Sequence, residues 1–175
     1  EPLANPYGMQ DHKYSINQKE NLSFLKKLRN VSEKYKNSIL LGEIDNKDLQ
    51  IKYTEGGDKL HLAYSFELLR KELSINSIQN SIDYFYSSTK DGWPCWSFSN
   101  HDVKRHISRW SEDKSNLSDL AKISCALLLS LRGTVCIYQG EELGQTETTL
   151  KFEELIDPPG IEFWPEEAGR DGCRT

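Results

Sequence analysis

The sequence predicts an α/β fold built on about four parallel strands. Short apolar stretches alternate with helical patterns, the connections between these stretches are long, and 175 residues suffice for one ordinary domain. Parallel pairing follows because a parallel connection needs a dozen or more residues. The pattern alone fits either part of a (β/α) barrel or a small open α/β sheet.

The first part of the chain predicts a loop, a helix and a strand. Residues 1–17 are rich in Pro, Asn, Gly and Tyr without periodicity, which is typical of a loop. A helix should open near Asn17, with an apolar stripe that consists of Leu22, Leu25, Leu28 and, slightly off register, Val31. Residues 38–42 form a continuous apolar run that suits a strand buried on both sides, and Glu43 follows at its end.

The middle of the chain continues the alternation. We expect a turn at residues 53–59 and a second strand, rich in aromatic and aliphatic residues, at 60–66. An amphipathic pattern predicts a helix near residues 74–86. Residues 94–99 then predict a third strand, which ends abruptly in polar side chains.

The strongest helical pattern covers residues 117–131, and Gly133 should end this helix. Residues 134–138 predict a fourth strand, and the rest of the chain is expected to form an irregular, Pro-containing tail. We therefore interpret residues 1–175 as one partial domain.

Composition limits the partners that we expect. The 22 basic and 27 acidic residues give a net charge of -5, which leaves no cationic surface for nucleic acid and fits a neutral ligand such as a sugar. No apolar run approaches the roughly 20 residues that span a bilayer, so membrane insertion is not expected.

The four cysteines are Cys95, Cys125, Cys136 and Cys173, and no two form a C-x-x-C pair. Two of them fall inside apolar runs, where a thiol packs as a small hydrophobic group. We expect all four to be reduced and structural, and the protein to be cytoplasmic.

Two carboxylates end apolar strands. Glu43 follows the first predicted strand, and Asn100, His101 and Asp102 follow the third. Because parallel strands end at one edge of a sheet, we expect the two carboxylates to face one cleft. Cleavage of a glycosidic bond needs a protonated acid at the leaving oxygen and a negative group beside the oxocarbenium-like transition state, which suits such a pair.

Other interpretations of these residues stay open from position alone. Glu43 could equally be a helix cap or an ion-pair partner in the loop that follows it. A His-Asp pair could also hold a metal, but no H-x-x-x-H, H-E-x-x-H or Cys/His spacing accompanies His101, so no metal is expected.

Two motifs carry a resemblance to a known family. Residues 98–105 read FSNHDxxR, and the chain ends in GRDGCRT at 169–175. The first resembles the fourth signature region of the α-amylase superfamily (glycoside hydrolase family 13), and the second is similar to its bacterial α-glucosidase and oligo-1,6-glucosidase branch. The segment LGEI at 41–44 resembles the third signature region of the family.

The resemblance implies a fold and a set of roles. The fold would be the C-terminal half, about four β/α units, of a TIM (β/α)8 barrel. Glu43 would be the general acid and base, and Asp102 would stabilise the transition state. His101 and Arg170 would contact the sugar of an oligosaccharide or disaccharide, and Arg174 would support the loop. No cofactor is implied, because no D-x-[DN]-x-[DN]-G calcium loop occurs.

One departure limits this interpretation. Neither of the two earlier signature regions, DVVxNH and GFRxD, occurs in the sequence, and the second ends in the Asp that attacks the sugar. A complete barrel also takes about 250 residues. We therefore expect a piece of a longer retaining, exo-acting α-glucosidase, which is inactive without the N-terminal half of the barrel as its partner.

Two alternatives remain. The chain could come from a glucosyl transferase or isomerase of the same superfamily, such as a sucrose isomerase, a trehalose synthase or an amylosucrase-like enzyme. It could also come from a non-catalytic protein that keeps the barrel as a scaffold. Such scaffolds lose their acidic residues, whereas Glu43, His101 and Asp102 are all present here.

Overall fold

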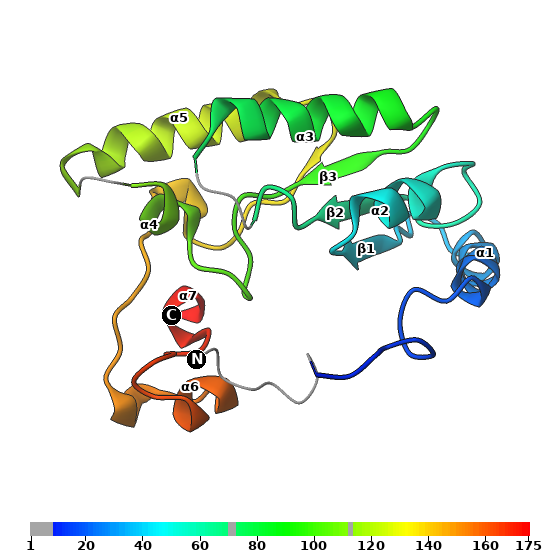
Figure 1. The fold of residues 1–175 in the computed structure, drawn as a ribbon. Coiled ribbons are helices and arrows are strands. Elements are labelled where there is room, and N and C mark those ends of the chain that lie inside the picture. The colour runs from blue at the N-terminus through cyan, green and yellow to red at the C-terminus, as the bar shows by residue number, and fades with distance from the viewer. Residues whose placement is uncertain (1–8, 70–72, 112–113) are drawn as a thin grey trace.

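Four parallel strands form one sheet in the computed structural model, which describes residues 9–69, 73–111 and 114–175 (Figure 1). The strands are β1 (Leu41–Ile44), β2 (Leu62–Ser65), β3 (Pro94–Trp96) and β4 (Thr134–Val135). They lie in the order β1-β2-β3-β4, and every neighbouring pair is parallel. The prediction of a parallel α/β sheet is therefore confirmed, although β3 and β4 end earlier than expected.

The strand register places one row of residues across the whole sheet. Glu43 pairs with Tyr64, Tyr64 with Cys95, and Cys95 with Thr134. Because side chains alternate between the two faces along each strand, these four side chains share one face. The neighbouring positions, such as Ile44, Ala63 and Trp96, belong to the apolar clusters on the opposite face.

The first strand lies three residues later than predicted. β1 begins at Leu41, so Glu43 lies inside the strand and not after its end. The expectation that this strand is buried on both sides is wrong, because Ile39 and Leu41 are exposed. β1 forms one edge of the sheet, where no neighbouring strand of the described chain covers its side chains.

The first helix, α1 (Glu20–Ser32), begins close to the predicted position. Only the first half of its apolar stripe packs against the core, where Leu22 and Leu25 lie beside Ile44 and Ala63. Leu28 and Val31 are exposed, which corrects the expectation that the whole stripe faces the core. The helix contacts the apolar cluster only through its first turns.

Two short helices before the tail were not predicted. α2 (Lys47–Thr54) begins after Asn46, whose side chain accepts hydrogen bonds from the backbone N–H groups of Asp48 and Leu49 at 2.9 and 3.0 Å. α4 (His106–Trp110) has only five residues. Helices of one or two turns carry too few apolar positions to show a clear period.

Two long helices cover one face of the sheet (Figure 1). They are α3 (Ile75–Ser88) and α5 (Leu117–Ser130), close to the predicted ranges. The larger core lies beneath them and contains Ile51, Leu68, Ile78, Phe85, Trp96, Phe98, Trp110 and Leu128. Trp96 of β3 contacts Phe85 of α3 edge to face at 5.9 Å between ring centroids, so this core fixes the third strand against the helices.

The tail after β4 is largely irregular, as predicted. It contains the 3-10 turns η2 (Glu141–Leu143) and η3 (Phe152–Glu154) and the short helices α6 (Pro158–Glu162) and α7 (Asp171–Arg174). One further 3-10 turn, η1 (Lys114–Asn116), precedes α5. The tail with α6 and α7 lies on the other side of the sheet from α3 and α5 (Figure 1).

Within the described part of the chain, none of the helices has the length and apolar character needed to cross a membrane.

The core beneath α5 yields a prediction with an internal control. Leu128 is 2% exposed, whereas its neighbour Leu129 is 58% exposed. Leu128→Ala should lower the free energy of unfolding by about 2–5 kcal/mol because it leaves a cavity, while Leu129→Ala should change it by about 0.5 kcal/mol or less. Urea unfolding of both variants measures this, and equal losses would show that α5 is not packed as described.

Candidate active site

Glu43 stands on the uncovered edge of the sheet beside Tyr64. Its side chain is exposed, and the strand register sets it directly opposite Tyr64. Burial raises the pKa of the Tyr64 hydroxyl, the neighbouring Glu43 carboxylate raises it further, and the Asn100 side chain lowers it. Tyr64 therefore stays protonated at neutral pH, with its hydroxyl between Glu43 and Asn100.

Glu43 does not cap the helix that follows it. Asn46 supplies the cap of α2, so the helix-cap interpretation of Glu43 is wrong. The carboxylate is left at the carboxyl end of β1, where it can meet a ligand. An exposed acid on a strand end, beside a protonated phenol, can donate a proton to a leaving group.

Asp102 lies in the loop between β3 and α4. The side-chain oxygen Oδ1 of Asn100 accepts a hydrogen bond of 2.9 Å from the Asp102 backbone N–H, which gives this loop a tight turn. Asn100 is buried, while the side chains of His101 and Asp102 are partly exposed. The loop therefore anchors itself through Asn100 and leaves the two predicted site residues accessible.

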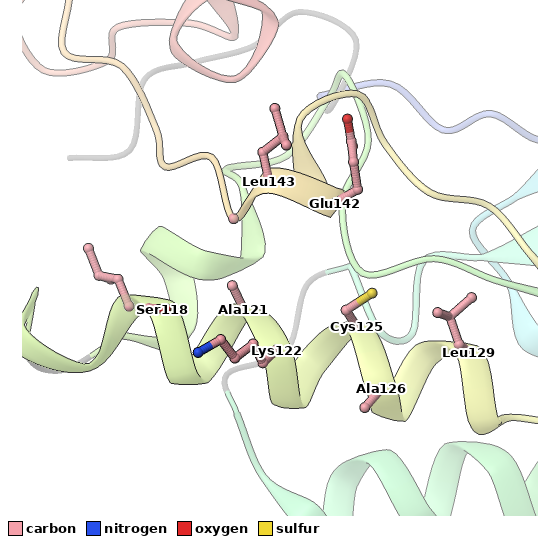
Figure 2. Close-up of a pocket in the computed structure, with 10 residues that line it drawn as sticks. Ser118, Ala121, Lys122, Cys125, Ala126, Leu129, Glu142 and Leu143 are labelled. Carbon is pink, nitrogen blue, oxygen red and sulfur yellow. The ribbon is translucent and has the colours of Figure 1, made fainter.

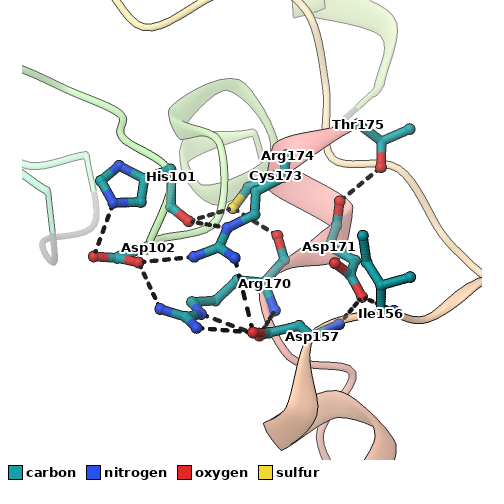
Figure 3. A network of polar contacts seen from close by, with 9 residues as sticks. All are labelled: His101, Asp102, Ile156, Asp157, Arg170, Asp171, Cys173, Arg174 and Thr175. Atoms are coloured by element: carbon teal, nitrogen blue, oxygen red, sulfur yellow. Dashed lines mark hydrogen bonds and ion pairs between the residues drawn. The ribbon is translucent and has the colours of Figure 1, made fainter.

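Two guanidinium groups and an imidazole surround the Asp102 carboxylate (Figure 3). One of its oxygens lies 2.8 Å from Nη1 of Arg170 and 3.2 Å from Nη2 of Arg174. The other lies 3.5 Å from Nε2 of His101. These pairs hold the carboxylate in one orientation and partly offset its charge.

Arg170 joins Asp102 to a second, buried carboxylate (Figure 3). It donates from Nε and Nη2 to Asp157 at 3.0 and 2.8 Å, and its backbone N–H donates to the same side chain at 2.8 Å. The side chain of Asp157 is 1% exposed. Hydrogen bonds from Arg170 hold the pKa of Asp157 below its ordinary value, and the same pairing raises the pKa of Arg170.

Arg170 therefore has a structural role, since it holds two acidic neighbours in place. Three of its side-chain N–H groups are engaged by Asp157 and Asp102, which fixes the guanidinium as a bridge between two loops. The side chain remains partly exposed, so its expected contact with sugar stays a prediction.

Helix α7 fastens the loop that carries His101 (Figure 3). Nε of Arg174 donates to the His101 carbonyl oxygen at 2.9 Å, which fits the supporting role expected for this arginine. At the start of α7, the Asp171 carboxylate accepts from the backbone N–H groups of Ile156 and Asp157, each at 2.7 Å. Helix α7 is thus bonded to residues 156 and 157 of the tail, and it also holds the loop that carries Asp102.

The structure links the two predicted acids through intervening residues. Tyr64 contacts Glu43 on one side and Asn100 on the other, and Asn100 binds the backbone of Asp102. Sequence analysis missed Tyr64 and Asp157. The register of β1 and β2 could have identified Tyr64. No local sequence pattern indicates the role of Asp157, because the partners of its side chain lie 13 and more residues away.

Cysteines and metal-ligating residues are the groups that would carry a second kind of chemistry in the part of the chain that the structure describes. All four cysteines are free. In the residues that the structure places, no group of three or more His, Cys, Asp and Glu side chains could hold a metal ion. The absence of a cofactor and the cytoplasmic location both stay predictions.

A groove of about 710 Å³ lies apart from these residues, between α5 and η2 (Figure 2). Its lining consists of Leu117, Ser118, Ala121, Lys122, Cys125, Ala126, Leu129, Glu142, Leu143 and Gly144. None of the predicted site residues lines it, so the candidate active site is the open surface around Glu43 and Asp102.

The bridge through Arg170 predicts a pH dependence of stability. Since the pKa of Asp157 is lowered on folding, its contribution is present above its ordinary pKa of about 3.9 and is lost as the pH falls through the lower, folded value. Asp157→Asn should cost about 2 kcal/mol at pH 7, and the difference from wild type should shrink below about pH 4.

Urea unfolding between pH 7 and pH 2.5 measures this difference. Glu153→Gln, at an exposed position in η3, is the matched control and should leave the profile unchanged. A difference between Asp157→Asn and wild type that stays constant down to pH 2.5 would contradict the ion-paired state of Asp157.

Comparison with known proteins shows the family of the chain. Residues 2–175 match the family described as "Alpha amylase, catalytic domain". The chain is 47% identical over 99% of its length to a probable alpha-glucosidase of Rhizobium meliloti (strain 1021). It is 30% identical over 89% of its length to an oligo-1,6-glucosidase of Heyndrickxia coagulans. It spans 32% and 31% of these two proteins.

Solved structures show the same relationship. The alpha-glucosyl transfer enzyme XgtA matches with a TM-score of 0.89 at 45% identity, over 98% of this chain and 32% of that one. The isomaltulose synthase from Erwinia rhapontici NX5 matches in fold, with a TM-score of 0.72 at 23% identity over 85% of this chain and 30% of that one. The chain therefore belongs to the α-amylase family and has the fold of part of its (β/α)8 catalytic barrel.

Proposed function

We propose that the chain is part of a retaining, exo-acting α-glucosidase that hydrolyses α-1,4 or α-1,6 glucosidic bonds in short oligosaccharides or disaccharides. The observation that carries the proposal is the placement of Glu43 and Asp102 around Tyr64 and Asn100. The 47% identity to a probable alpha-glucosidase supports the same substrate class.

Glu43 is assigned the proton transfers. In the first step its carboxyl group protonates the glycosidic oxygen as the bond to the sugar breaks, and in the second step its carboxylate takes a proton from water. Tyr64 stays a phenol beside it, because burial and Glu43 itself raise the Tyr64 pKa. The Tyr64 hydroxyl can therefore hydrogen-bond the Glu43 carboxylate after it has given up its proton.

Asp102 is assigned to the developing positive charge. A carboxylate held by Arg170 and Arg174, on a loop whose backbone is bound by the Asn100 side chain, needs no reorganisation when the sugar becomes oxocarbenium-like. His101, beside it, would bind a hydroxyl of the same sugar through its exposed ring. Arg170 would add a contact from the N–H groups that Asp157 and Asp102 leave free.

The attacking carboxylate does not come from this chain. The sequence lacks the signature region that ends in the nucleophilic Asp, and the chain spans about a third of its relatives. We propose that the N-terminal half of the barrel supplies it. Without it no covalent glycosyl-enzyme forms, so the 175-residue chain alone should not turn over.

Glucosyl transfer is the second candidate function. The match to XgtA, which is described as an alpha-glucosyl transfer enzyme, at 45% identity favours it. Both reactions need the same acid and the same stabilising carboxylate, and they differ in whether water or a sugar hydroxyl accepts the glucosyl group. Product analysis with maltose, isomaltose and sucrose distinguishes them, since transfer gives new oligosaccharides or isomers and hydrolysis gives glucose.

The proposed acid can be tested in the longer enzyme. Glu43→Gln removes the proton donor and should lower kcat on an unactivated disaccharide by about 10²- to 10⁴-fold. The control is Glu142→Gln, an exposed position in η2 outside the proposed site, which should keep kcat within about twofold. Equal kcat values for the two variants would remove Glu43 from the mechanism.

The dependence on the rest of the barrel has its own test. The isolated 175-residue chain should show no hydrolysis of p-nitrophenyl α-glucoside. Turnover by the isolated chain that is abolished by Glu43→Gln would refute the proposal that the nucleophile lies elsewhere.

A further inference from the structure

A buried imidazole lies directly behind the loop that carries Asp102. His106, the first residue of α4, is 1% exposed. Its Nδ1 lies 2.9 Å from the Ser99 hydroxyl oxygen and 3.0 Å from a carboxylate oxygen of Glu141. Its Nε2 lies 2.8 Å from the Ser124 hydroxyl oxygen. One ring thus joins the β3 loop, the segment after β4 and helix α5.

The Nδ1 side of the ring faces the base of the Asp102 loop. Ser99 comes directly before Asn100, and its hydroxyl oxygen also accepts from the His106 backbone N–H at 2.9 Å. Its carbonyl oxygen accepts from the Ser97 hydroxyl at 2.6 Å. The start of the loop is therefore held on both sides of Ser99, and a shift of the His106 ring would be passed to Asn100 and Asp102.

Glu141 approaches the ring from the segment after β4, with Oε1 3.0 Å from Nδ1 but without a hydrogen bond to a described residue. It is buried in η2, and its second carboxylate oxygen accepts from the Tyr138 backbone N–H at 2.9 Å. Arg109 is the other charged group that faces it. Burial lowers the pKa of Arg109 to about 10, and the attraction of Glu141 acts against this shift. The Tyr138 backbone N–H and the electrostatic attraction of Arg109 are therefore the interactions that stabilise the buried Glu141 carboxylate.

Aromatic rings restrict the imidazole further. The centroids of Phe98 and Trp110 lie 5.8 and 5.0 Å from that of His106. Both rings are buried in the core beneath α5. The imidazole therefore has little freedom to change its tilt.

We infer that His106 is a positioning residue, which fixes the loop at Ser99 and so sets the place of the Asp102 carboxylate. The inference rests on the proposed function, because it assigns Asp102 a role in catalysis. His106 touches no substrate and acts only through Ser99. A displacement of about 1 Å at a reacting group can lower the rate on the order of 10²-fold. Loss of the contact between His106 and Ser99 should therefore lower kcat.

Amide substitutions can distinguish the contribution of Nδ1 from that of Nε2. His106→Asn places a polar group near the position of Nδ1, toward Ser99 and Glu141. His106→Gln places one near the position of Nε2, toward Ser124. Ser124→Ala removes the contact to α5 and leaves the Nδ1 side unchanged.

The experiment measures kcat, KM and the thermal midpoint of the longer enzyme with p-nitrophenyl α-glucoside. His106→Gln should lower kcat by about 10- to 100-fold with little change in KM, whereas His106→Asn should restore most of it. Ser124→Ala should lower the thermal midpoint and keep kcat within about threefold. Wild-type kcat in His106→Gln, or a kcat loss that merely follows the thermal midpoint across all three variants, would overturn the inference.

Hydrogen exchange separates this inference from the proposed function. Exchange in residues 97–105 should rise in His106→Gln and remain at the wild-type level in Ser124→Ala, whatever the substrate of the enzyme. A wild-type enzyme that cleaves no α-glucoside would refute the proposed function alone. Unchanged exchange in His106→Gln would refute the positioning role alone.

Discussion

Parallel pairing in one fixed register is the constraint on which this structure depends. It sets Glu43, Tyr64, Cys95 and Thr134 in a row across all four strands. A slip of one residue in β1 would turn Glu43 to the helix-covered face and bring Ile44 out to the site. The apolar clusters prevent this slip, since Ile44 and Ala63 are held by Leu25 and Leu60. The chemistry on one face is therefore fixed by packing on the other.

Ion pairs hold the loop after β3 in place. The loop after β3 is held by Arg170 and Arg174 of the tail, and Arg170 is held in turn by the buried Asp157. Neither carboxylate lacks a cationic partner, which is the condition for keeping charge in a partly desolvated site. His106 supports the same loop from behind through Ser99. The site is thus assembled from β1, β2, the loop after β3 and the segment after β4, and no single element would form it.

The longer helices, the four strands and the motif residues could be predicted from the sequence. The helices α3 and α5 and all four strands were predicted, because their apolar patterns reflect one buried face. The helices α2 and α4 were missed because they are short, and β1 was placed three residues too early because the apolar run 38–42 was assumed to be buried. Glu43, His101 and Asp102 were found from signature motifs. The roles of Tyr64, Asp157 and His106 depend on contacts between distant segments, which no local pattern contains.

A crystal structure of the longer enzyme with bound glucose shows whether Glu43 and Asp102 bind the same sugar. We expect one glucose with a hydroxyl group within hydrogen-bond distance of Asp102 and His101, and with its anomeric oxygen beside the Glu43 carboxyl group. Glucose bound in the groove between α5 and η2, with Glu43 and Asp102 both out of its reach, would contradict this expectation.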